Sequence, residues 1–127
     1  MNTYLLALIG LLGMFVVGVL CYGVFFKSMI ADNAVKLTPG RFVIAGIGMY
    51  VIAWAFIWLF NNVMMDGVDG VMKGIELGLL VGIPFFVVPV FADAPYFKSA
   101  KMGIEWVVIA NWLLSFVVLG IIVGALV

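Results

Sequence analysis

The side chains best suited to chemistry in this chain are a few polar groups inside otherwise apolar stretches. Asn111 stands within a run of Leu, Val, Ile and Phe, and Ser115 follows it by one helical turn, on the same face. A carboxamide and a hydroxyl can bind a small solute or a lipid headgroup, or they can hydrogen-bond across helices and hold them together. The sequence leaves both uses open.

Two further residues are expected at the depth of Asn111. Tyr50 and Pro84 lie at nearly the same distance from the inner ends of their own apolar runs. Pro84 has no N–H, so it leaves the carbonyl of Leu80 unpaired and bends its helix. The sequence therefore predicts a candidate polar site made of Tyr50, Leu80, Pro84, Asn111 and Ser115.

Catalytic and metal-binding chemistry has few residues available. The chain has no histidine, which removes the commonest general base and metal ligand. The hydroxyls of Ser28, Thr38 and Ser99 therefore lack a histidine base. The single cysteine, Cys21, has no basic residue within one turn and is expected to be a small packing residue. We predict no catalytic residue, no metal site and no cofactor.

The elements that must position these residues are four long apolar runs, with the charges between them. The runs cover residues 4–26, 42–60, 74–92 and 103–127. At a rise of about 1.5 Å per residue, each spans roughly 28 Å or more, the thickness of a bilayer's hydrocarbon core. Of 127 residues, 68% are hydrophobic and 9% charged, against about 25% charged in a soluble domain. These features predict an all-α fold: one domain, residues 1–127, of four transmembrane helices.

The basic residues indicate how these helices are oriented. Loops 27–41 and 93–102 share one side and hold five of the six Lys and Arg residues, whereas loop 61–73 holds only Lys73. Positive charge accumulates in short cytoplasmic loops, so both termini are expected on the outer side of the membrane. The first run lacks a basic start and is too long for a signal peptide, so we expect it to be retained. Anionic lipid headgroups are expected at Lys27, Arg41, Lys98 and Lys101.

Two helix starts and two ion pairs are also predicted. Thr38 followed by proline is typical of an N-cap and a first helical position, and Asp69 is expected to cap the third helix. Glu76 and Glu105 each follow a lysine by one turn, so both are expected to form interfacial ion pairs. The two carboxylates fall on opposite sides of the membrane and cannot act as a catalytic dyad.

Glycine recurs every four residues along one side of the third helix. A missing side chain lets a neighbouring backbone approach closely, which is how membrane helices pack. The pattern predicts close packing and leaves three partners open: another helix of the chain, a second copy of the chain, or a solute moving along the strip. We name this strip the glycine ribbon; its members are Gly70, Gly74, Gly78 and Gly82, and Gly120 and Gly124 repeat the spacing in the fourth helix.

The end of the first helix carries a family resemblance. The stretch Cys-Tyr-Gly-Val-Phe-Phe-Lys at residues 21–27, and the helix pair from Gly78 to Gly124, resemble an uncharacterised family of small bacterial four-helix inner-membrane proteins. The chain departs from that pattern at Cys21 and Val24, where the family has tryptophan and proline. The resemblance implies four helices and a bacterial inner membrane, and it implies no activity.

These observations predict a non-enzymatic integral membrane protein. The expected role is an oligomerising or accessory subunit that packs through the glycine ribbon, with membrane lipids and a second copy or another chain as partners. The zero net charge gives no sign of a nucleic-acid partner. The alternative is a small transporter or channel, with its site near Tyr50, Pro84 and Asn111, and a lipid- or quinone-binding module is a third possibility. A subunit needs a dry interior, whereas a transporter needs a wet path to Asn111.

Overall fold

The computed structural model describes residues 2–25, 38–65, 67–89 and 102–127, without the side chains of residues 25 and 102–105. Every regular element in these ranges is helical: α1 (Thr3–Leu20), η1 (Cys21–Phe25), α3 (Pro39–Asn62), α4 (Gly70–Gly82), η3 (Ile83–Val87) and α6 (Met102–Leu126). The elements η1 and η3 are π-helical continuations of α1 and α4. Four helical spans are long and apolar enough to cross a membrane, as predicted: Thr3–Val24, Pro39–Asn62, Gly70–Val87 and Trp106–Leu126.

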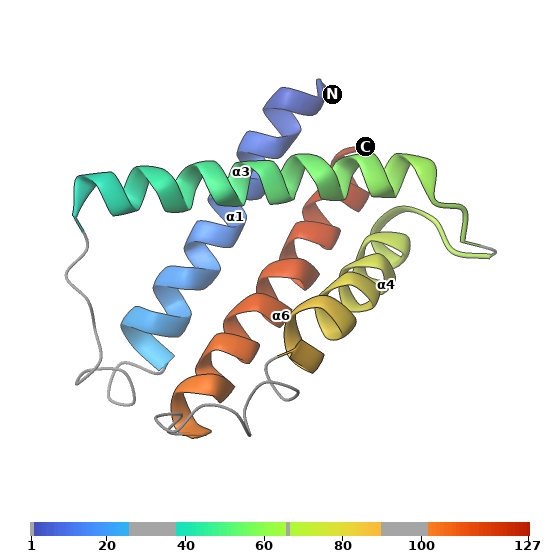
Figure 1. Cartoon of the computed structure of the whole chain (residues 1–127). Helices are drawn as coiled ribbons and strands as arrows, with labels where there is room; N and C mark the ends of the chain where they lie inside the picture. Colours follow the sequence, from blue (N-terminus) through green and yellow to red (C-terminus); the bar gives the residue numbers. More distant parts are fainter. Residues whose placement is uncertain (1, 26–37, 66, 90–101) are drawn as a thin grey trace.

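Helix α6 is the centre of the arrangement. Figure 1 shows α1 and α4 on either side of it, and α3 lying across the three. Gly10 of α1 lies beside Leu119 and Gly18 beside Asn111, so α1 and α6 are antiparallel. The same reasoning makes α4 antiparallel to α6, since Gly78 lies beside Phe116 and Gly82 beside Leu113. Having neighbours on both sides, α6 is the most buried span, with 44% of its most apolar window buried, against 17% for α3.

Helix α3 crosses the others obliquely (Figure 1), and its buried residues all lie in its second half. Its buried residues are Ala53, Phe56, Ile57 and Phe60, which follow the spacing of one helical face. All residues from 38 to 45 are exposed, and Ile44 is 72% exposed. The first half of α3 therefore carries most of its apolar surface outside the bundle.

The helix starts follow local capping chemistry. The Oγ1 atom of Thr38 accepts a hydrogen bond from the N–H of Arg41 at 3.3 Å, with Pro39 at the first position of α3, which confirms the predicted start. Asn2 caps α1 in the same way, accepting from the N–H of Tyr4 at 2.8 Å. Asp69 occupies the N-cap position of α4, but its side chain makes no capping hydrogen bond. That part of the prediction is wrong.

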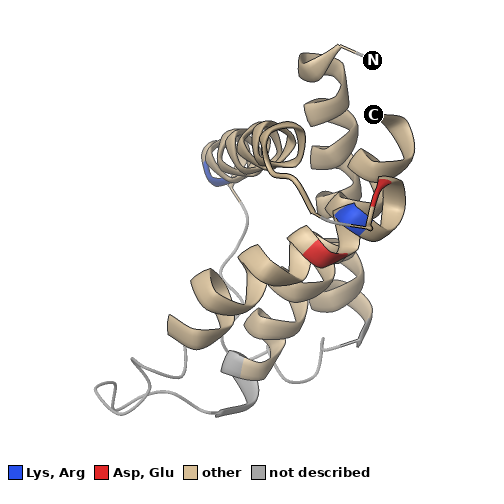
Figure 2. Ribbon diagram, turned by 90° about the vertical axis from the view of Figure 1, so that its right-hand side faces the viewer, with Lys and Arg blue, Asp and Glu red and all other residues tan. Residues whose placement is uncertain are grey.

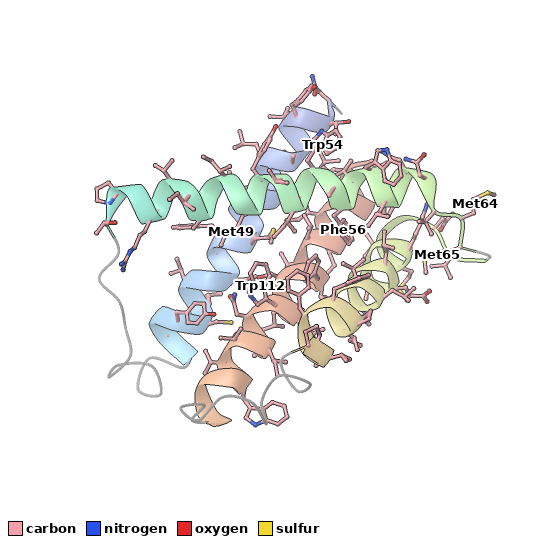
Figure 3. The ribbon with its side chains drawn as sticks, in the orientation of Figure 1. Met49, Trp54, Phe56, Met64, Met65 and Trp112 are labelled. Atoms are coloured by element: carbon pink, nitrogen blue, oxygen red, sulfur yellow. The ribbon has the colours of Figure 1, made fainter. Side chains whose placement is uncertain are left out.

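The core between α3, α6 and η3 is aromatic. Figure 3 shows Phe56 on α3 and Trp112 on α6, both labelled, in the space where the two helices approach. Phe116 joins the three elements: its ring centroid is 6.3 Å from Phe56, 4.9 Å from Phe86 and 6.2 Å from Trp112. Phe86 and Trp112 stack on each other with centroids 4.9 Å apart. Offset and tilted rings at such distances attract each other beyond their area of burial.

Candidate functional site

Asn111 and Ser115 are the buried polar side chains of the described core. They are 6% and 2% exposed and lie one turn apart on α6. A Cβ added to Gly18 of α1 would lie 3.8 Å from the Oδ1 atom of Asn111, an ordinary contact distance, so the carboxamide oxygen faces α1 at this level. This oxygen is buried and has no hydrogen-bond partner among the described residues. A buried acceptor without a donor costs about 1–3 kcal/mol, so Asn111 needs an explanation beyond packing.

The structure removes Tyr50 from the predicted polar site. Its hydroxyl donates a hydrogen bond of 3.3 Å to the backbone carbonyl of Tyr4, at the far end of α1 from Gly18. Fourteen residues of helix separate those two α1 positions, about 21 Å along the axis. The prediction was wrong because it counted depth as if α3 ran along the bundle axis, whereas α3 crosses it obliquely.

Leu80 and Pro84 are near the level of Asn111 but on another surface. Gly82 lies beside Leu113, which places Pro84 close to the depth of Asn111 along α6. Leu80 is nevertheless 59% exposed and Pro84 is exposed as well, so both point away from α6. Pro84 is taken up in the π-helical turn η3, where its missing N–H is accommodated. Of the five predicted members, Asn111 and Ser115 are buried together on α6, whereas Leu80 and Pro84 lie together on the outer face of α4 and η3.

The glycine ribbon lies against α6 within the same chain. A Cβ added to Gly74 would lie 2.6 Å from the carbonyl carbon of Gly120, and one added to Gly78 would lie 2.5 Å from the carbonyl oxygen of Phe116. These neighbours are backbone atoms and cannot rotate away. At Gly82 the nearest atoms are side-chain carbons of Leu113 and Phe116 at 3.5 Å, an ordinary contact distance. The backbones of α4 and α6 are therefore closest toward the start of α4.

The same approach continues to the first residue of α4. A Cβ on Gly124 would lie 2.7 Å from the carbonyl carbon of Gly70. Gly70 also has a φ of +56°, a backbone conformation that disfavours other residues. The small-residue spacing recognised in the sequence thus marks the surface shared by α4 and α6.

The predicted ion pair between Lys73 and Glu76 is absent from the described residues, which contain no salt bridge within 4.0 Å. Lys73 instead places its Nζ atom 4.5 Å from the centroid of the Phe60 ring, a cation–π contact. Figure 2 shows acidic and basic residues close together. In the sequence, Asp69 is the N-cap of α4, and Lys73 and Glu76 follow within the helix. Spacing along one helix could not reveal that an aromatic ring of α3 would compete for the lysine.

The predicted headgroup contacts fall largely outside the described part of the chain. Lys27, Lys98 and Lys101 lie there, as does the side chain of Glu105. Arg41 is described and is exposed at the start of α3, a position open to solvent or headgroups. Within the described ranges, no three His, Cys, Asp or Glu residues are close enough to hold a metal ion.

Two hollows were not predicted from the sequence. One, of about 240 Å³, is lined by aromatic and amide side chains where α1 begins and α3 ends: Thr3, Tyr4, Trp54, Ile57, Trp58, Asn61 and Asn62. The other, a shallow groove of about 400 Å³, follows the outer face of α4 and η3 and is lined by Glu76, Leu79, Leu80, Ile83 and Pro84. The residues that line this second hollow recur at helical spacing, so the sequence could have shown that they share one face of the helix.

Comparisons with family models, with curated proteins and with solved structures found no match. The family resemblance drawn from the sequence therefore stays a prediction.

Proposed function

We propose that this chain is a non-enzymatic integral protein of the bacterial inner membrane that works as an oligomerising or accessory subunit. Membrane insertion is supported by large apolar side chains on the outer surface, whose exposure to water would be unfavourable. Tyr4, Ile44 and Phe85 are each at least two-thirds exposed. Lipid tails cover such surfaces without free-energy cost. Both termini lie near one end of the molecule in Figure 1, in keeping with an even number of crossings.

The association surface in this proposal is α3. The glycine ribbon is occupied by α6, so it serves packing within the chain and is not open to a second copy. Helix α3 is the least buried span, and its outward face carries three exposed small residues at helical spacing, Ala45, Gly48 and Ala55. Apart from the adjacent turns of α3 itself, no described atom lies within 4 Å of a Cβ built at Gly48. This open small-residue face is the observation that carries the proposal, because membrane helices associate through small residues.

Leucine at Gly48 is expected to weaken self-association about fivefold or more. The added side chain would hold a second α3 away, and overpacking typically costs about 1–3 kcal/mol. Native mass spectrometry from mild detergent measures copy number, and Gly40→Leu is the matched control. Gly40 also lies in open space but in the first turn of α3, about 12 Å along the helix axis from Gly48 and outside the predicted apolar run, so the same substitution there should leave the oligomer intact.

A wild-type chain that is monomeric at every concentration, with no other chain retained, would overturn the subunit proposal. Retention of a different chain, lost in Gly48→Leu, would identify an accessory subunit in place of a homo-oligomer. Equal oligomer masses in the wild type, Gly48→Leu and Gly40→Leu would remove α3 as the surface.

A small transporter or channel is the second candidate, and Asn111 is the observation that favours it. Its Oδ1 atom is buried without a partner among the described residues. The two helices that flank α6 change to π-helical geometry near the level of Asn111, in η1 and η3. Such π-helical turns are common at functional sites. Access of water to Asn111 would indicate a transport site, whereas a dry interior would indicate that Asn111 serves packing between helices.

Cysteine labelling tests both the orientation and the water path. In a Cys21→Ser background, cysteine at Asn2 should react with an impermeant thiol reagent in intact spheroplasts, and cysteine at Lys36 only after the membrane is opened, because the basic loops are proposed to face the cytoplasm. Cysteine at Asn111 should stay unlabelled on both sides if the interior is dry. Labelling at Lys36 but not at Asn2 reverses the orientation, and rapid labelling at Asn111 moves transport to first place.

A further inference from the structure

Glu76 is a carboxylate without a cation in the described structure. Its expected partner, Lys73, lies over the Phe60 ring, and Glu76 makes no ion pair or hydrogen bond with any described residue. It stands six residues after Gly70, about 9 Å along the helix axis from the start of α4. The apolar run predicted for this helix begins at Gly74, two residues before Glu76, so in a chain inserted as proposed the carboxylate lies at the edge of the hydrocarbon core. An ionisable side chain at such a depth calls for a partner.

The groove beside Glu76 is apolar along the rest of its length. Leu79, Leu80, Ile83 and Pro84 continue the stripe that Glu76 begins, running along α4 into η3, on the face turned away from the glycine ribbon. Leu80 and Ile83 are 59% and 45% exposed. The hollow thus has one anionic end near the start of α4 and an apolar body extending from it. Its complement is an amphiphile with a cationic head and a hydrocarbon tail.

A lipid fits this surface better than the helix of a second chain. Close helix contacts in membranes use small residues, and the lining of the groove contains none. The small residues of α4 are already packed on α6. Bulky Leu and Ile side chains on a single helix stripe give a surface that a flexible acyl chain can follow and a rigid helix cannot approach closely.

We propose that the groove formed by Glu76, Leu79, Leu80, Ile83 and Pro84 binds a phospholipid with a primary-amine headgroup, of the ethanolamine class. The ammonium pairs with the Glu76 carboxylate, and one acyl chain lies along the apolar stripe. A primary ammonium offers N–H donors that make charge-assisted hydrogen bonds to a carboxylate, whereas a choline head has none. This inference rests on the membrane insertion proposed above and is independent of association through α3.

The test is competitive lipid retention. The full chain is reconstituted in bilayer discs with equal amounts of ethanolamine, choline and glycerol phospholipids carrying identical acyl chains, then released gently, and the bound lipids are counted by native mass spectrometry. The wild type should retain ethanolamine lipid about fivefold over choline lipid, which corresponds to about 1 kcal/mol. Glu76→Gln should return this ratio to that of the bilayer, while Glu76→Asp should keep most of the preference.

Asp69→Asn is the matched control. It removes an exposed carboxylate at the N-cap of the same helix, outside the groove, so the lipid ratio should not change. The thermal midpoint of each variant shows whether it is folded.

An ethanolamine preference that is equal in the wild type and Glu76→Gln would overturn the inference. A change in oligomer mass in Glu76→Gln without a change in lipid ratio would also overturn it, since Glu76 would then pair with a basic residue of another chain. A chain that stays in solution without detergent would instead show that membrane insertion is wrong, which is a different failure.

Discussion

Alanine at Gly74 is expected to destabilise the protein, whereas alanine at Gly46 is expected to stabilise it slightly. A Cβ on Gly74 would lie 2.6 Å from the carbonyl carbon and 3.1 Å from the Cα of Gly120, so the backbones of α4 and α6 must separate. Overpacking of this kind costs about 1–3 kcal/mol. Gly46 is also helical, but no described atom lies within 4 Å of its added Cβ, so alanine there gains up to about 1 kcal/mol in helix propensity.

Thermal unfolding in one detergent, followed by circular dichroism, measures both changes. Leucine should also distinguish two positions of the ribbon. The loss of stability should be larger at Gly78, whose added side chain would meet the backbone of α6, than at Gly82, whose added side chain would meet side-chain carbons of Leu113 and Phe116. Leu79→Ala and Leu80→Ala are the reference substitutions away from α6. Midpoints that fall equally for Gly74→Ala and Gly46→Ala would show that α4 and α6 do not meet through these glycines.

Alanine at Phe116 is expected to cost about 3–5 kcal/mol of unfolding free energy, the usual range for a fully buried phenylalanine. Phe116 is 2% exposed and contacts the rings of Phe56, Phe86 and Trp112, so its loss opens a cavity among three elements. The cavity term arises because packed neighbours relax only partly into the space.

Phe85→Ala is the matched control, since Phe85 is a neighbour of Phe86 in sequence yet is 70% exposed. Its replacement should change the free energy of unfolding by no more than about 0.5 kcal/mol. Reversible unfolding in mixed micelles of increasing denaturing detergent gives both values. If the two alanine variants lost equal stability, the aromatic cluster would not be the core of this fold.

The sequence by itself determined the helical elements and where most of them begin. Long apolar runs predict helices because a chain surrounded by lipid must satisfy its backbone hydrogen bonds within each segment. Thr38 and Pro39 fixed the start of α3 because a capping hydroxyl and a proline act through atoms only a few residues away. Such signals are local, so they can be recognised without knowing any neighbour. The four-residue spacing of glycines likewise predicted a close contact, although not the partner.

Only the tertiary structure decided what each helical face meets. The oblique crossing of α3 takes Tyr50 to the carbonyl of Tyr4 and away from Asn111, and no count of residues along one helix contains that angle. Lys73 lies over Phe60, a residue of another helix, which leaves Glu76 without the partner that its spacing predicted. The ribbon faces α6 because Gly120 and Gly124 match its spacing from the opposite direction. Periodicity describes one helix, whereas packing depends on the distance and angle between two, and these are set by all contacts together.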